Sequence, residues 1–196
     1  MEKICLDFDT YDDIMFFESL KKGSYGNIVE YSDDTLLKLY HDRHYELRHE
    51  SVEELQEVHD EELKILEQKL EVLKNTKVSD LYKGVVESKD CVVGVIMTYY
   101  KDYQSLYEVI NTLNRKEKIK ILKKVRNVFN NLIENGCYPL DLSLGNIMIR
   151  KRDLDVKIID LDDLLTQYKF ELNEDYMKFE NESKNSFNEV VKTILK

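Results

Sequence analysis

At 196 residues the chain can bury one sizeable hydrophobic core, either as one domain or as two small lobes. Its formal net charge of −10 argues against a nucleic-acid-binding protein, which would show a basic stripe, and leaves room for a basic protein partner. Three widely spaced cysteines without a C-x-x-C pair favour reduced thiols in the cytoplasm. The sequence shows no signal peptide and no membrane span, so we expect a cytoplasmic protein. Delivery to a host cell would require an export signal of another kind.

The first hundred residues predict a β-rich half that contains one long helix. Its first three strands are expected at 14–20, 27–32 and 35–40. A Ser51/Glu54 capping box then begins a charged helix that carries leucines on one face as far as Leu73. A second hairpin is expected to join residues 81–87 to residues 91–100 through the turn SKD.

After residue 100 the pattern becomes helical. A second capping box, Ser105/Glu108, predicts a short helix. Apolar residues then recur on one face over 115–134, and Gly136 follows as the expected C-terminal glycine of that helix. The change of pattern near residue 100 suggests a hinge between two halves.

Beyond this helix the sequence predicts a strand pair, an acidic linker and a last helix. The strands are expected at 147–150 and 156–159, and a Ser186/Glu189 capping box is expected to begin the helix. The chain is therefore predicted to be α+β. The predicted lobes are residues 1–100 and residues 101–196.

Two aspartates and an asparagine interrupt the apolar runs of this second half. In YPLDLSLGNIMI, residues 138–149, Asp141 and Asn146 are five positions apart, and Asp160 follows the next apolar strand. A carboxylate beside buried strands is costly unless something pairs with it, so a turn, a helix cap or a metal-bound phosphate must explain these positions. The strand pair is expected to present Asn146 and Asp160 at one end.

This order of elements and motifs resembles the protein-kinase-like superfamily over residues 14–165. Kinases carry a catalytic Asp, a metal-binding Asn five residues later, and a second metal-binding Asp after a β-pair. The resemblance therefore implies that Asp141 is the catalytic base and that Asn146 and Asp160 hold Mg²⁺ on ATP. It also implies a two-lobed kinase-like fold, with an antiparallel-sheet N-lobe that has one long helix and a reduced helical C-lobe.

The resemblance extends to residues that would bind the ATP phosphates. KGSYGNIV is similar to a kinase glycine-rich loop that lacks its first glycine, and a plain hairpin turn is the alternative. The loop residues that would cover the phosphates are Gly23, Ser24, Tyr25 and Gly26. Lys38, in TLLKLY, stands where kinases have their phosphate-binding lysine, unless it is a solvent-facing lysine of an edge strand. Its helix partner would be Glu62, with Glu67 as the other choice.

The stretch VGVIMTYYKDYQSL resembles the kinase strand and hinge that hold adenine. Met97 would be the gatekeeper, and Gln104 would contact the ribose. The hinge would consist of Thr98, Tyr99 and Tyr100.

Several positions depart from the usual kinase pattern. Pro139-Leu140 stand where His-Arg precedes the base, and Ser143 stands where a lysine usually lies. The triplet that begins at Asp160 reads Asp-Leu-Asp instead of Asp-Phe-Gly. Aminoglycoside-type phosphotransferases share the last two departures. Asp162 or Asp163 would be available to help with the metal.

The resemblance implies a minimal protein Ser/Thr kinase, similar to the small kinases that some bacteria carry, with ATP and Mg²⁺ as cofactors. The implied partner is a protein substrate or an activating protein. A small-molecule kinase of the aminoglycoside or choline type and a pseudokinase binding module are the alternatives. His41 and His44 are spaced for metal binding, but no ordered set of four ligands accompanies them.

Overall fold

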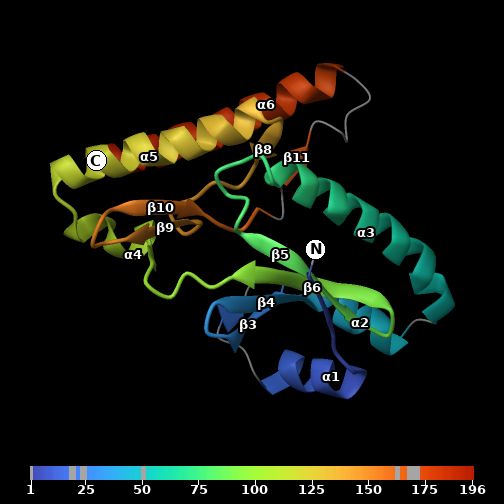
Figure 1. The fold of residues 1–196 in the computed structure, drawn as a ribbon. Coiled ribbons are helices and arrows are strands. Elements are labelled where there is room, and N and C mark those ends of the chain that lie inside the picture. The colour runs from blue at the N-terminus through green and yellow to red at the C-terminus, as the bar shows by residue number, and fades with distance from the viewer. Residues whose placement is uncertain (1, 18–20, 23–25, 50–51, 162–163, 167–172) are drawn as a thin grey trace. The chain divides into compact units, whose positions relative to one another are not determined.

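The computed structural model shows two compact units, each built from helices and β-sheets (Figure 1). It describes residues 2–17, 21–22, 26–49, 52–161, 164–166 and 173–196, without the side chains of 17, 21–22, 52–62, 164–166 and 173–176. Unit 1 comprises Met1–Gln68 and Asp80–Lys101, and unit 2 comprises Lys69–Ser79 and Asp102–Lys196. Residues 69–79, which we expected in the first lobe, therefore group with the second unit.

Unit 1 is built on a six-stranded sheet with the order β1-β5-β6-β4-β3-β2. The strands are β1 (Glu2–Cys5), β2 (Lys21–Lys22), β3 (Gly26–Ser32), β4 (Thr35–Tyr40), β5 (Tyr82–Ser88) and β6 (Cys91–Thr98). The strands expected at 27–32 and 35–40 and the second hairpin are confirmed. All neighbouring strands are antiparallel except β1 and β5, which are parallel. The resemblance had implied an antiparallel sheet, and the parallel β1–β5 pair departs from that expectation.

The strand expected at 14–20 was wrong, because residues Phe8–Phe17 form helix α1. The Asp7 carboxylate begins this helix by accepting hydrogen bonds from the Thr10 N–H at 2.9 Å and the Thr10 hydroxyl at 2.7 Å. Tyr11 and Met15, four residues apart, are both buried on one face. Met15 of the apolar run IMFF therefore belongs to a buried helical face and not to a strand.

Strand β1 was not expected at all, because its sequence is EKIC. It pairs with β5 at a place where the backbones approach closely, since a Cβ at Gly84 would lie 1.9 Å from the carbonyl oxygen of Glu2. Only glycine allows this approach. A parallel pairing across some eighty residues leaves no local signal in the sequence.

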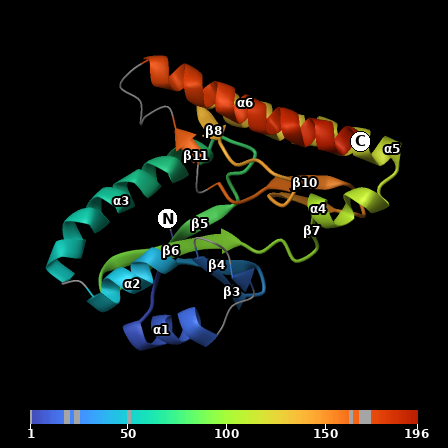
Figure 2. The ribbon, with the colours of Figure 1, turned by 180° about the vertical axis from the view of Figure 1, so that it is seen from behind.

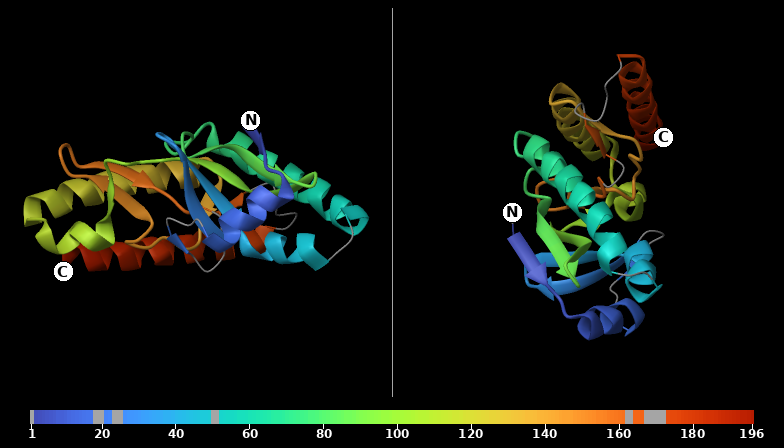
Figure 3. Two further views of the ribbon diagram at one scale, coloured as in Figure 1. Left: turned by 90° about the horizontal axis from the view of Figure 1, so that it is seen from below. Right: turned by 90° about the vertical axis from the view of Figure 1, so that its right-hand side faces the viewer.

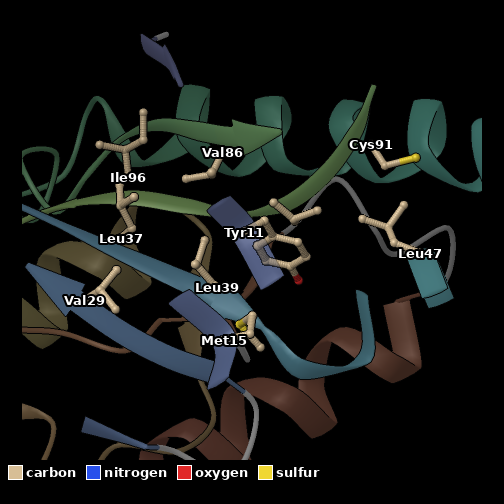
Figure 4. Packing of buried hydrophobic residues seen from close by; sticks show 10 residues of the cluster. Tyr11, Met15, Val29, Leu37, Leu39, Leu47, Val86, Cys91 and Ile96 are labelled. Carbon is tan, nitrogen blue, oxygen red and sulfur yellow. The ribbon is translucent and has the colours of Figure 1, made fainter. Parts of the chain in front are cut away.

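In the described part of unit 1, two further helices accompany the single long one that we expected. The long helix is α3 (Val52–Leu73), whose last five residues group with unit 2, and α2 (His41–His49) precedes it. Residue 51, the expected N-cap, lies outside the described residues. The core of the unit contains Tyr11 and Met15 of α1 and Leu47 of α2, packed against Leu37 and Leu39 of β4 (Figure 4).

Unit 2 combines two long helices with two small sheets. The helical segments are α4 (Leu106–Val109), the 3₁₀ helix η1 (Ile110–Thr112), α5 (Arg115–Glu134) and α6 (Asn173–Leu195). One sheet has the order β10-β9-β7, and the other pairs β11 with β8. The strands are β7 (Gln104–Ser105), β8 (Cys137–Pro139), β9 (Ile147–Arg150), β10 (Asp155–Ile158) and β11 (Leu164–Thr166). The Ser105/Glu108 capping box is confirmed, and α5 ends just before Gly136, whose φ is 72°.

The last helix begins thirteen residues earlier than expected, at Asn173, so Ser186 is not its N-cap. In the added part of the helix, an ion pair joins Lys184 to Glu180 on the preceding turn. Helix α6 lies alongside α5 (Figures 2 and 3), and Phe187 stacks on Phe129 with ring centroids 4.4 Å apart. Within the described part of the chain, no helix is long and apolar enough to cross a membrane.

Candidate active site

The hairpin of β9 and β10 places Asn146 and Asp160 at the same end. The strands pair in the register Ile147 to Ile158, and the N–H of Ile159 donates to the carbonyl oxygen of Asn146 at 2.9 Å. Asn146 directly precedes Ile147 on β9, and Asp160 lies two residues after Ile158 of β10. The hairpin geometry expected from the sequence is confirmed.

The loop before β9 brings Asp141 close to Asn146. The Asn146 side-chain Nδ2 donates to the Asp141 carbonyl oxygen at 3.0 Å, and the Asn146 backbone N–H donates to the Ser143 carbonyl oxygen at 3.2 Å. The Asn146 side chain thus uses its nitrogen to close the loop, and its Oδ1 is the acceptor that remains. The Asp141 side chain itself is exposed.

Asp141 and Asp160 line the same small cavity in unit 2. Its other lining residues are the apolar neighbours Pro139, Leu140, Leu142, Ile158, Ile159 and Leu161. The cavity volume is about 10 Å³, room for roughly one water molecule or one ion of that size. The three polar residues singled out from the sequence are therefore gathered at one edge of unit 2.

Asp160 has an unusual backbone conformation. Its φ is 57°, in the left-handed region, where a side chain costs about 1–2 kcal/mol and Asp and Asn are the most tolerated after Gly. The other described non-glycine residues with positive φ, which are Lys89, Asp90 and Leu154, all lie in turns between paired strands. Asp160 instead follows the end of β10, where the buried Leu161 side chain fixes the next residue. Strain of this kind concentrates at functional sites.

Polar contacts stabilise the β9–β10 hairpin at its turn, opposite the end that carries Asn146 and Asp160. Arg150 donates to both carboxylate oxygens of Asp153 at 3.1 and 2.8 Å. The Tyr103 hydroxyl donates to Asp155 at 2.6 Å, and burial together with this carboxylate raises the pKa of Tyr103 to about 12. The hydroxyl therefore stays protonated at physiological pH.

One residue that holds the loop was misread from the sequence. Ser186, expected as a helix cap, makes two hydrogen bonds to the backbone of Leu142, at 2.9 Å each. Nothing local indicates this role, because the two residues are 44 positions apart.

Unit 1 contains the residues assigned to the phosphates. Lys38 lies on β4, a central strand paired with β3 and β6, and only 7% of its surface is exposed. Leu37 and Leu39 belong to the core around Tyr11, so Lys38 points to the opposite face of the sheet. A solvent-facing lysine on an edge strand is thereby excluded. Burial of an ammonium group is costly unless a partner compensates for it.

Its proposed partners are described to different extents. The backbone of Glu62 lies in α3, but its side chain is outside the described residues, whereas the Glu67 side chain is exposed. Of the glycine-rich stretch, residues 23–25 lie outside the described part, so nothing tests a role for Gly23, Ser24 or Tyr25. Gly26 begins β3, where a Cβ would lie 2.3 Å from the Leu39 carbonyl oxygen. Close pairing of β3 and β4 is therefore sufficient to explain this glycine.

The end of β6 and the residue that follows it are already hydrogen-bonded within unit 1. Met97 is buried, the Thr98 N–H donates to the Leu81 carbonyl oxygen at 2.9 Å, and the Tyr99 N–H donates to the Asp34 carbonyl oxygen at 2.8 Å. An adenine would have to be bound by other groups here, such as carbonyl oxygens or the backbone of residue 100.

Gln104, assigned to the ribose, belongs to unit 2. It is exposed on β7, where it pairs with Ile149 of β9. The structure thus places the proposed ribose residue in the same small sheet as the Asn146–Asp160 hairpin.

The two histidines with metal-like spacing each have a separate protein partner. His41 Nε2 lies 3.0 Å from Asn27 Oδ1, and His44 Nε2 lies 2.7 Å from Asp12 Oδ1. Among the residues that the structure describes, no group of three or more His, Cys, Asp or Glu side chains is arranged to hold a metal ion.

Comparisons with known proteins add no family assignment. No family model matches the chain, and no curated protein matches it. The function must therefore be judged from the residues of this chain.

Proposed function

We propose that the protein is a Mg·ATP-dependent phosphotransferase, in the form of a minimal protein Ser/Thr kinase. One observation carries the proposal: Asp141, Asn146 and Asp160 converge at one edge of unit 2, around a cavity that the two aspartates share. Their spacing is that of a kinase base and its two metal ligands. The β9–β10 hairpin and the Asn146 hydrogen bond to Asp141 bring the three residues together, and the proposed chemistry gives this arrangement a use.

The donor atoms suit the proposed cofactor. Mg²⁺ prefers hard oxygen ligands and is usually held by one or two carboxylates together with substrate phosphates. The carboxylate of Asp160 and the amide oxygen of Asn146 provide such a pair, whereas neither residue offers a soft ligand. When bound, the ion would neutralise charge on the transferring phosphate.

Asp141 is assigned to the acceptor side of the reaction. Its exposed carboxylate would accept the proton of the acceptor hydroxyl as the oxygen bonds to the γ-phosphorus and the bond to the β-phosphate oxygen breaks. ADP then leaves with the former bridging oxygen. In unit 1, Lys38 is assigned to the α- and β-phosphates, with Glu62 or Glu67 as its carboxylate partner.

A protein acceptor is favoured over a small molecule by the little chain available to enclose one. Residues 102–114 contain only a two-residue strand, a four-residue helix and a three-residue 3₁₀ helix. The long helix α6 packs along α5 through Phe187. Small-molecule kinases usually build an acceptor pocket from extra helices, and the described segments 102–114 and 173–196 offer little for this, so we favour an extended protein segment as the acceptor.

The test is phosphate transfer from radiolabelled ATP in Mg²⁺, to generic protein acceptors in one arm and to aminoglycosides and choline in another. Asp141→Asn should abolish transfer, and Asp102→Asn, at an exposed position elsewhere in unit 2, should not. Transfer only to the small molecules would replace the protein-kinase assignment. Mg·ATP binding without any transfer would indicate a pseudokinase, and equal transfer by wild type and Asp141→Asn would reject the proposal.

A further inference from the structure

A hydroxyl in the middle of α6 holds both backbone groups of the residue that follows Asp141. Ser186 Oγ accepts a hydrogen bond from the Leu142 N–H at 2.9 Å and donates one to the Leu142 carbonyl oxygen at 2.9 Å. A side chain that satisfies both groups of one residue fixes the two peptide planes that flank it. One of these planes joins Leu142 directly to Asp141.

Asn146 holds the same loop from the other side. Its side chain donates to the Asp141 carbonyl oxygen, and its backbone N–H donates to that of Ser143. Ser186 and Asn146 together therefore make hydrogen bonds to each of the three consecutive residues 141–143. The conformation that points the Asp141 side chain depends on these two residues, one of which is assigned to the metal.

Helix α6 gives Ser186 a firm position. The next residue, Phe187, is buried and stacks on Phe129 of α5 with only 14° between the ring planes. Val190 and Ile194 continue the buried face at three- and four-residue spacing. The Leu142 side chain is also buried, so the hydrogen-bonded pair lies beside a packed core on both sides.

We propose that Ser186 is a positioning residue for phosphotransfer, which acts through Leu142 to set the orientation of the Asp141 carboxylate and the Asn146 amide. This inference rests on the proposed function of that loop. Ser186 makes no contact with substrate in this role, so its loss should affect the catalytic step more than ATP binding. Misplacement of a catalytic group by about 1 Å can cost roughly a hundredfold in rate.

The experiment compares Ser186→Ala, Ser186→Thr and Ser183→Ala. Ser183 lies one turn earlier on α6, is fully buried, and its Oγ has no hydrogen-bond partner in the described structure, so it controls for removal of a buried serine hydroxyl from this helix. We expect Ser186→Ala to lower kcat by about 10- to 100-fold while the KM for ATP stays within about twofold. Ser186→Thr, which keeps the hydroxyl, should recover most of kcat, and Ser183→Ala should match wild type.

Amide hydrogen exchange provides a readout that does not need activity. In Ser186→Ala the Leu142 amide should exchange about tenfold faster, as expected when the bond from its N–H to the Ser186 hydroxyl is lost, while the amides of α5 keep their protection. Ser186→Thr should restore protection at Leu142.

The outcomes separate this inference from the proposed function. Unchanged exchange at Leu142 in Ser186→Ala overturns the inference, and so does an unchanged kcat in an enzyme that Asp141→Asn inactivates. If wild type transfers no phosphate, the proposed function fails and the positioning role fails with it, whereas the exchange experiment still decides whether Ser186 holds the loop. If Ser186→Ala does not fold, the comparison passes to Ser186→Cys, whose weak S–H donor should leave Leu142 less protected than in wild type.

Discussion

Three substitutions at Asp160 separate its charge from its backbone conformation. Asp160→Gly and Asp160→Ala both remove the carboxylate, but only the glycine variant also removes the Cβ that is strained at a φ of 57°. Asp160→Ala should therefore have a lower free energy of unfolding than Asp160→Gly by about 1 kcal/mol, less the entropy that glycine adds to the unfolded chain. Asp160→Asn tolerates this conformation and should match wild type within about 0.5 kcal/mol.

The ligand response should follow the charge and not the backbone. For wild type, Mg·ATP at about 100 times its Kd should add about 2.7 kcal/mol, a rise in Tm of roughly 5 to 11 °C for a chain of this length. All three variants should lose most of this rise, although their stabilities without ligand differ. The assay is thermal unfolding with Mg·ATP, with ATP and EDTA, and without ligand. A full Mg·ATP response in Asp160→Asn, or an equal wild-type response in EDTA, would refute the metal assignment.

Three further predictions follow from other parts of the molecule. Asp141→Asn should lower kcat without raising the KM for ATP, because it acts on the acceptor; steady-state kinetics would contradict this if KM rose instead. Phosphatase treatment should leave activity intact, because Leu140 cannot bind an activating phosphate as an arginine does; restoration by phosphorylation within residues 161–180 would oppose it. The Asp34 pKa is lowered from 3.8 to about 2, chiefly by the Thr35 hydroxyl and then by Lys83, so its stabilising effect should be present above pH 4 and lost as the pH falls toward 2. A carboxyl NMR titration with a midpoint near 4 would count against that last prediction.

Elements held by local contacts could be predicted from the sequence. The β5–β6 and β9–β10 hairpins combine apolar strands with short polar turns, and α5 carries a regular apolar stripe bounded by a glycine. The convergence of Asn146 and Asp160 follows from the second hairpin alone. These predictions succeed because strand alternation and turn residues act within a few positions of one another.

The remaining features depend on contacts between distant residues. Strand β1 exists because Gly84 lets it approach β5, and its own sequence is half charged. The run that forms the end of α1 fits a strand equally well until Tyr11 and Met15 are seen to share one buried face. Ser186 carries the local pattern of a helix cap, but its hydroxyl is used by Leu142. The burial of Lys38 likewise depends on the two strands beside it.

The separation of 44 positions between Leu142 and Ser186 has a consequence for the newly made chain. At 5–20 residues per second, translation reaches Ser186 about 2 to 9 s after Leu142, and α6 must then pack on α5 before its hydroxyl can hold the loop. The β9–β10 hairpin needs only local contacts and can form during this interval. A ribosome-bound chain would thus already contain every residue that we assign to catalysis, while the loop that carries Asp141 is not yet held by Ser186. If the proposed function holds, such a delay would keep the unfinished chain inactive until α6 has packed on α5.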